Sequence, residues 1–165
     1  IAQGIKDLYW DVRPKPEFGT VEIRVCDTPL SIEQAISLAA FAQSLARWLL
    51  RTRPPLHTER QAHVARYNKF QACRYGLDAE ISDPEGLCQR PLRQTLAHLL
   101  EAISEDAREL GCLHWLNPLK NILAEGTGDA AWLRERFRQQ GNLHDVVREA
   151  SDRLMRSETR HGEQT

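Results

Sequence analysis

The chain has 165 residues, of which 41% are hydrophobic and 27% charged, and its formal net charge is -1 at pH 7. This composition is typical of a soluble globular domain, and the near-zero charge argues against a general electrostatic attraction to nucleic acid. No apolar run approaches the roughly 20 residues that span a bilayer, so we expect no membrane association. The four cysteines are widely spaced, which fits a reducing cytoplasm better than a zinc site or a disulfide framework.

Residues 1–28 have a strand-like pattern. Residues 20–26 alternate β-branched apolar side chains with polar ones, which predicts a strand whose apolar face can be buried. Residues 8–13 predict a second strand. Because Pro14, Pro16 and Gly19 interrupt the chain between the two, we expect an antiparallel pair joined by a loop.

From Ser31 to about residue 157 the pattern is helical, with apolar side chains at a period near 3.6 and with capping residues or glycines at the expected ends. Ser31 and Gln34 can form a capping box at the first of these helices. Residues 77–90 form a polar connection that contains Asp83-Pro84 and Gly86. We expect helices at residues 32–51, at 59–75 (with a Thr58–Gln61 capping box and a stop at Gly76), at 91–110, at 118–124, at 129–140 capped by Asp129, and at 143–157 capped by Asn142, followed by a polar tail over 158–165.

Two acid-then-arginine pairs lie on the predicted strands. Glu22 and Arg24 are two residues apart, so they project from one face of their strand about 7 Å apart, and Asp11 and Arg13 repeat this spacing on the neighbouring strand. If the strands pair, that face is crowded with carboxylates and guanidinium groups. It is then either a solvated surface with cross-strand ion pairs, or a site where a carboxylate holds Mg²⁺ and a guanidinium binds a phosphoryl group.

Two longer stretches resemble a known family. Residues 9–27, YWDVRPKPEFGTVEIRVCD, resemble the stretch W-D-[VI]-R-P-x-P-x-[FL]-G-T-[VL]-E-[VI]-R-[VI]-x-D of the carboxylate–amine ligases of the type-2 glutamate–cysteine ligase family. Residues 68–78, NKFQACRYGLD, are similar to that family's downstream segment N-[RK]-[WF]-x-A-x-R-[YH]-G-[LM]-[DE], with Phe70 where tryptophan is commoner. Two extended matches in the right order are more specific than one short motif.

The resemblance implies an α+β fold. Residues 1–165 would be the C-terminal part of one glutamine-synthetase-like catalytic domain, itself mainly α-helical with a short antiparallel β pair near its start. Residues 1–28 would supply strands of the active-site sheet, residues 31–157 would form a helical region behind it, and residues 158–165 would be a tail.

The resemblance also implies a reaction. ATP, with Mg²⁺, would phosphorylate a carboxylate such as glutamate to an acyl phosphate, and an amine such as cysteine would displace the phosphate to form an amide. By matching position, Glu22 would be a Mg²⁺ ligand, Arg24 would contact the transferring phosphate or the acyl phosphate, and Arg13 would contact substrate or phosphate. Asn68 and Arg74 would border the nucleotide or substrate cleft, and the enzyme would be a cytoplasmic homodimer.

Simpler interpretations stay open. Asn68 and Arg74 also suit an ordinary helix surface, since a basic residue in the last helical turn is favourable in any case. In the family, further metal-binding glutamates come from an N-terminal half, so we expect this chain alone to bind Mg-ATP poorly and to be inactive. The alternative function is a non-catalytic assembly or partner-binding module, because residues 91–157 form amphipathic helices without an evident catalytic constellation.

Overall fold

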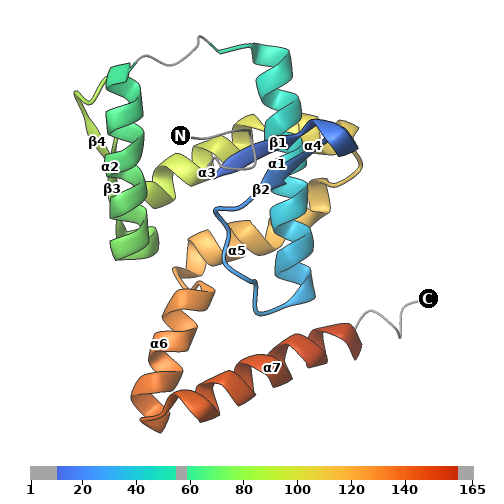
Figure 1. Cartoon of the computed structure of the whole chain (residues 1–165), viewed down its shortest axis with the longest axis vertical. Coiled ribbons are helices and arrows are strands. Elements are labelled where there is room, and N and C mark those ends of the chain that lie inside the picture. Colours follow the sequence, from blue (N-terminus) through green and yellow to red (C-terminus); the bar gives the residue numbers. More distant parts are fainter. Residues whose placement is uncertain (1–10, 55–58, 160–165) are drawn as a thin grey trace.

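The computed structural model describes residues 11–54 and 59–159, and it confirms a mainly helical α+β chain with an antiparallel β pair near its start (Figure 1). A second short hairpin follows α2. The helices are α1 (Ile32–Thr52), α2 (Glu59–Tyr75), α3 (Leu92–Ala102), α4 (Ser104–Glu109), α5 (Asn117–Glu125), α6 (Asp129–Gln140) and α7 (Leu143–Thr159). The strands are β1 (Val12–Lys15), β2 (Thr20–Ile23), β3 (Glu80–Ser82) and β4 (Gln89–Pro91), and short 3-10 helices lie at η2 (Pro16–Phe18), η3 (Gly76–Asp78) and η4 (Leu113–Leu116).

Helix α1 is the centre of the packing. Ser31 caps it, because its side chain accepts a hydrogen bond from the backbone N–H of Gln34 at 3.2 Å, and it ends at Arg53 with a left-handed backbone (φ 45°). Helices α4 and α5 and the η4 turn pack against it, with Ile103 and Leu116 fully buried at the contact.

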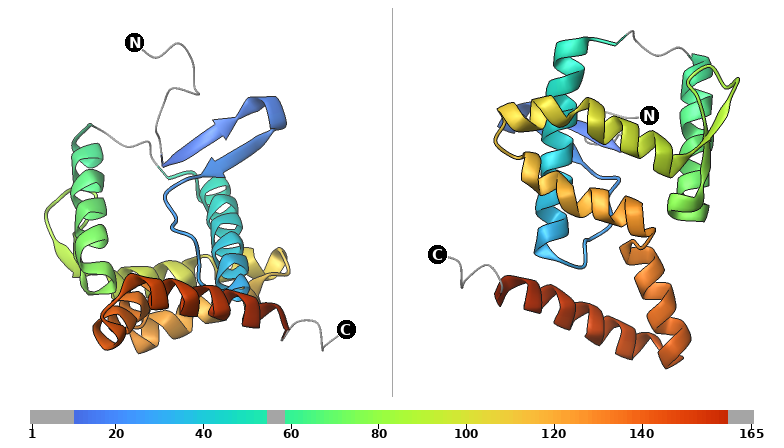
Figure 2. Two further views of the ribbon diagram at one scale, coloured as in Figure 1. Left: turned by 60° about the horizontal axis from the view of Figure 1, so that its bottom comes forward. Right: turned by 180° about the vertical axis from the view of Figure 1, so that it is seen from behind.

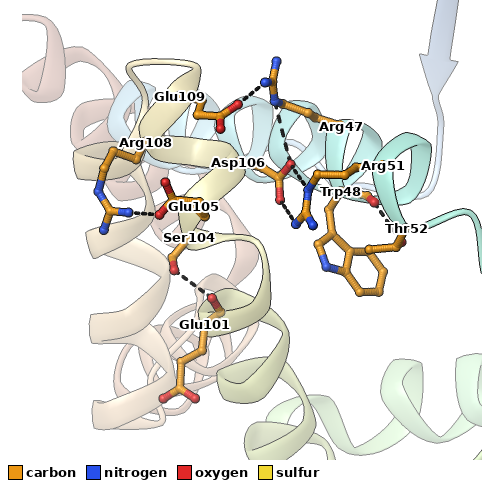
Figure 3. A network of polar contacts seen from close by, with 10 residues as sticks. All are labelled: Arg47, Trp48, Arg51, Thr52, Glu101, Ser104, Glu105, Asp106, Arg108 and Glu109. Atoms are coloured by element: carbon orange, nitrogen blue, oxygen red, sulfur yellow. Dashed lines mark hydrogen bonds and ion pairs between the residues drawn. The ribbon is translucent and has the colours of Figure 1, made fainter.

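An ion pair between a buried acid and a half-exposed arginine joins α1 to α4 (Figure 3). The side chain of Asp106 is 2% exposed and accepts hydrogen bonds from Nε and Nη2 of Arg51 at 3.1 and 2.8 Å. Nε of Arg47 lies 3.7 Å from the same carboxylate, and Arg47 also pairs with Glu109. The Arg51 guanidinium holds the pKa of Asp106 below its ordinary value, so this carboxylate is ionised at neutral pH.

The remaining elements flank this centre. Figure 1 shows α2 with β3 and β4 on one side of α1, linked back to it by α3, whereas α6 and α7 extend from the far end of α5. Figure 2 shows the β1–β2 hairpin as an arm above α1. None of the helices in residues 11–54 and 59–159 is long and apolar enough to cross a membrane.

The β1–β2 hairpin differs from its predicted bounds and from its predicted burial. The strand expected at 8–13 begins at Val12 in the described part and continues through Pro14 to Lys15, while residues 8–10 lie outside the described residues. The strand expected at 20–26 ends at Ile23. The apolar face that we expected to be buried is exposed, with Val21 64% accessible, because a two-stranded sheet covers neither face without a further layer of structure.

Pro14 fits within β1 because hydrogen-bonded and non-hydrogen-bonded residue pairs alternate along the β1–β2 ladder. Arg24 donates its backbone N–H to the carbonyl of Asp11 at 2.7 Å, which makes those two residues a hydrogen-bonded pair. Hydrogen-bonded and non-hydrogen-bonded pairs alternate, so Pro14, opposite Val21, falls in a non-hydrogen-bonded pair and its nitrogen points away from β2. The proline therefore removes no hydrogen bond between β1 and β2.

The polar connection 77–90 contains a hairpin that was not predicted, because β3 and β4 pair within it, with Ile81 opposite Arg90. Two further expectations are wrong. The helix expected over residues 91–110 is divided at Ile103 into α3 and α4, and Ser104 there donates to the carbonyl of Glu101, an interaction that bends helices. Asp129 does not cap α6.

The cap of α6 is Gly128, and the Asp129 side chain instead accepts a hydrogen bond from the backbone N–H of Leu30 at 3.0 Å. The acid thus ties the segment before α1 to α6, 99 residues further on. In contrast, Asn142 caps α7 as expected, because its side-chain oxygen accepts from the N–H of Asp145 at 2.9 Å. The predicted cap at Thr58 and the tail from residue 160 lie outside the described residues.

Candidate functional site

The charged face of the β1–β2 hairpin brings three of the predicted site residues together. Arg13 lies directly opposite Glu22, and its Nε and Nη2 both donate to Oε2 of Glu22 at 2.9 and 2.6 Å. Nε of Arg24 lies 3.9 Å from the other oxygen, Oε1. The side chain of Arg13 is only 12% exposed, so the charged face is the more covered face of the hairpin.

The local sequence explains why this face is ordered. Arg13 and Lys15 each precede a proline, which disfavours the helical region for both residues. At the turn, Gly19 has φ +62° and donates its N–H to the carbonyl of Pro16 at 3.3 Å, a left-handed conformation that glycine adopts without strain. The strands therefore return in a register that sets Arg13 against Glu22.

The electrostatics of the face favour an anion. The hydrogen bonds from Arg13 lower the pKa of Glu22 below its ordinary value of 4.5, and the charges of Arg13, Lys15 and Arg24 lower it further. Glu22 is thus ionised at neutral pH, with three cations around one carboxylate. Such an excess of positive charge suits a phosphoryl group, which carries more than one negative charge.

Magnesium fits these residues only in part. Mg²⁺ prefers oxygen ligands and often takes one or two carboxylates together with phosphate oxygens. Oxygen Oε2 of Glu22 is engaged by Arg13, which leaves Oε1 as the oxygen that could face an ion. Within the described residues no three His, Cys, Asp or Glu side chains cluster closely enough to hold a metal. Among the described residues this face therefore offers Glu22 as its carboxylate ligand, and phosphate, water or other residues would have to supply the rest.

The structure places Asn68 and Arg74 on α2, with contacts of their own. The side-chain amide of Asn68 donates a hydrogen bond to the backbone carbonyl of Ser82 and accepts one from the backbone N–H of Ser82, both at 2.8 Å. These two bonds hold β3 against α2. Nε of Arg74 donates to the hydroxyl of Tyr75 at 3.1 Å, and its guanidinium lies over that ring. These contacts lie within α2 and β3 and do not join either residue to the charged face.

One residue beside Asn68 does reach the hairpin. Nζ of Lys69 lies 2.5 Å from Oδ1 of Asp11, at the end of the charged face. This ion pair anchors the face to α2 and neutralises its second acid. The two partners are 58 residues apart, so no local signal in the sequence indicates this contact.

Asn68 also lines a groove of about 520 Å³ between α2 and the β3–β4 hairpin. Its walls are mainly apolar, from Ala62, Val64, Ile81 and Pro84, with Asp83 and Arg90 among its polar residues. This groove was not predicted from the sequence, because β3 and β4, which form one of its walls, were not predicted.

Comparison with known proteins defines the class. The sequence model of glutamate-cysteine ligase family 2 matches residues 1–153, and the chain belongs to this family. The chain is 78% identical over all 165 residues to a protein of Dechloromonas aromatica (strain RCB) named "Putative glutamate--cysteine ligase 2".

Proteins of the same name in Verminephrobacter eiseniae (strain EF01-2) and Acidovorax sp. (strain JS42) are 44% and 46% identical over 154 residues, which is 93% of this chain. The match covers 43% of the Dechloromonas protein and 41% of each of the other two. The chain thus spans less than half the length of these curated relatives.

Proposed function

We propose that this chain is part of an ATP- and Mg²⁺-dependent carboxylate–amine ligase that joins glutamate to cysteine. Membership of glutamate-cysteine ligase family 2 and the names of the relatives support the reaction class. The observation that carries the proposal is the arrangement of Arg13 and Arg24 on either side of the ionised Glu22. It offers both a carboxylate for a metal and guanidinium groups for a phosphoryl group.

In the proposed reaction an oxygen of the acid's carboxylate attacks the γ-phosphorus of ATP, and the bond to ADP breaks. The product is an acyl phosphate. The amine nitrogen then attacks its carbonyl carbon, phosphate leaves, and loss of a proton from nitrogen gives the amide. Mg²⁺, when bound, neutralises part of the phosphate charge.

Each residue of the charged face has a role in this scheme. Arg24 offers its guanidinium to the transferring phosphoryl group, where a prepositioned charge lowers the barrier because it need not reorganise. Glu22 would hold the metal through Oε1. Arg13 fixes the Glu22 carboxylate by its two hydrogen bonds and adds positive charge beside the phosphate.

Asn68 and Arg74 have the proposed role of bordering the nucleotide or substrate cleft. For Asn68 this role would be indirect, since its amide already binds Ser82 and keeps β3 against α2. For Arg74 the guanidinium stacked on Tyr75 lies at the surface, at the end of α2.

The experiment is a measurement of ADP release by the longer protein that contains this chain, supplied with Mg-ATP, glutamate and cysteine. We expect release that requires both substrates and that falls on the order of 10²–10³-fold in Arg24→Ala, the loss typical of a removed transition-state charge. Arg138→Ala is the matched control, because Arg138 is an exposed arginine on α6 paired with Glu135. ADP release that ignores Arg24 would reject the assignment of the site.

We further propose that the 165-residue chain alone is inactive, since Asp11 is paired with Lys69 and the described residues of the charged face leave only Glu22 as a carboxylate for a metal. Turnover by this chain above a no-enzyme control would contradict that. A second candidate function, a homodimeric assembly or partner-binding module, is favoured by the exposed apolar side chains of Leu143, Val147 and Met155 on α7. It would gain if Glu22→Ala and Arg24→Ala left the activity of the longer protein unchanged.

A further inference from the structure

Lys15 extends the charged face of the hairpin beyond the predicted site. It lies two residues after Arg13 on β1 and opposite Thr20, so it projects from the same side of the sheet as Arg13 and Glu22. Exposure agrees with this placement. Arg13, Lys15 and Glu22 are partly covered, whereas Val12, Pro14, Val21 and Ile23 on the other face are exposed.

The geometry sets the three cations in a row. Residues two apart on a strand are about 7 Å apart, so Lys15 lies about 7 Å from the Arg13–Glu22 pair on its turn side. Arg24 lies about as far on the opposite side. The row is therefore about 14 Å long, enough for an anion at each end and the carboxylate of Glu22 between them.

Lys15 differs from its neighbours in what it contacts. Arg13 and Arg24 both pair with Glu22, and Lys69 pairs with Asp11. Among the residues that the structure describes, the side chain of Lys15 takes part in no hydrogen bond or ion pair, although its charge acts on Glu22. An ammonium group on a partly covered residue, without a partner among the described side chains, is suited to bind an anion as a point charge.

The backbone at Lys15 is also restrained. Pro14 fixes φ on one side, and Pro16 keeps Lys15 itself out of the helical region on the other. The ammonium group therefore needs only side-chain ordering to meet a ligand, which reduces the entropic cost of binding.

We infer that Lys15 is a third anion-binding residue of this face, and that it binds an anionic group of a substrate at the turn end of the hairpin. This inference rests on the proposed function for the identity of the substrates. The anionic group is either a phosphate of the nucleotide or the second carboxylate of the acid substrate, because both present oxygen anions to an ammonium group.

The test compares Lys15→Met, Lys15→Arg and the control Lys120→Met in the longer protein. Lys120 is an exposed lysine on α5, away from the hairpin. We expect Lys15→Met to raise one KM on the order of tenfold with a smaller change in kcat, as for a charge that binds the ground state and transition state alike. A raised KM for Mg-ATP identifies the phosphate, and a raised KM for glutamate identifies the carboxylate. Lys15→Arg should restore binding.

Two further outcomes keep the inference separate from the proposed function. If the longer protein shows no ADP release with glutamate and cysteine, the proposed reaction fails, and inorganic pyrophosphate binding by isothermal titration then tests Lys15 directly. A Kd for pyrophosphate that rises about tenfold in Lys15→Met and not in Lys120→Met supports the anion site. Unchanged KM values, or pyrophosphate binding that is absent or indifferent to Lys15, overturns it.

Discussion

Arg13 and Glu22 face each other across the β1–β2 ladder, and both N–H groups of the arginine fork converge on one oxygen of the carboxylate. This leaves the second oxygen, Oε1, on the side of Arg24. Arg13 thus fixes the orientation of the Glu22 carboxylate in addition to placing a positive charge beside it. A lysine at position 13 could supply the charge but not the two-point contact.

The first prediction concerns the titration of Glu22. Its pKa lies below 4.5 in the folded chain because of Arg13, so the ionised form persists as the pH falls past 4.5 and is lost only through the lowered value. In Arg13→Met we expect the ¹³C NMR titration midpoint of the Glu22 carboxyl carbon to rise towards 4.5. Arg138→Met should leave it unchanged, and an unmoved midpoint in Arg13→Met would show that the fork is absent in solution.

This titration separates two ways in which Arg13 can act. At pH 7 Glu22 is ionised with or without Arg13, because both pKa values lie far below neutrality. A loss of activity in Arg13→Met at pH 7 therefore reflects lost orientation or lost phosphate binding, and protonation of Glu22 cannot explain it.

The second prediction concerns the buried acid of α4. The pKa of Asp106 is lowered by Arg51, so the pair stabilises the fold fully above the ordinary value of 3.8, and this stabilisation is lost as the pH falls through the lowered pKa. We expect Asp106→Asn to lower the urea midpoint at pH 7, and the difference from the wild type to shrink below pH 3.8.

The control for Asp106 is Glu105→Gln, in the same turn but in an exposed pair with Arg108. Exposed ion pairs contribute about 0.2–1 kcal/mol, so the urea midpoint of this variant at pH 7 should be close to that of the wild type. Equal effects of the two substitutions would mean that Asp106 is solvated in the folded state.

The sequence was sufficient for features that depend on near neighbours. The period of two placed Arg13, Glu22 and Arg24 on one face, and the caps at Ser31 and Asn142 follow from interactions three residues long. The signal for Lys15 was present too, since it continues the alternation of Asp11 and Arg13, but only the observed register extended β1 past Pro14.

Features that depend on distant partners were out of reach. Arg51 and Asp106 are 55 residues apart, and neither carries a local signal that it meets the other. Strands β3 and β4 have three residues each, too short for a period to show, and Asn68 of α2 holds β3 in place. Which face of the β1–β2 hairpin is covered depends on packing beyond the strands themselves, so the alternation alone predicted it wrongly.

The third prediction concerns the core. Ile103 is fully buried where α3 gives way to α4, and it packs in one cluster with Ala40, Leu100, Ala107 and Leu116. Truncation leaves a cavity, so Ile103→Ala should lower the free energy of unfolding by about 2–5 kcal/mol, measured by urea denaturation. Leu50→Ala is the control.

Leu50 lies on α1 with 76% of its surface exposed, so its truncation should change stability by no more than about 0.5 kcal/mol. If the two variants lost comparable free energy of unfolding, Leu50 would have to be buried by a contact outside the described residues.

The last prediction compares two glycines that end helices in the same conformation. Gly126 after α5 and Gly141 after α6 have φ values of +74° and +73°, and each donates its N–H to the carbonyl four residues earlier at 2.9 Å. Alanine at either position lowers stability by about 1–2 kcal/mol, because its Cβ disfavours the left-handed backbone conformation. The surroundings differ, because a Cβ at Gly141 meets nothing within 4 Å, whereas one at Gly126 would overlap the guanidinium of Arg93, which pairs with Asp78 at 2.6 Å.

An arginine end group can move aside, so the extra cost at Gly126 is the loss of an exposed ion pair and its packing. We expect Gly126→Ala to lower the free energy of unfolding by about 0.5 kcal/mol more than Gly141→Ala does. In an Arg93→Ala background the two alanine variants should become equal, which a double-mutant cycle by urea denaturation measures. If the two alanine variants still differ by several kcal/mol in free energy of unfolding in the Arg93→Ala background, the cause would instead be the backbone at Gly126 and not the guanidinium of Arg93.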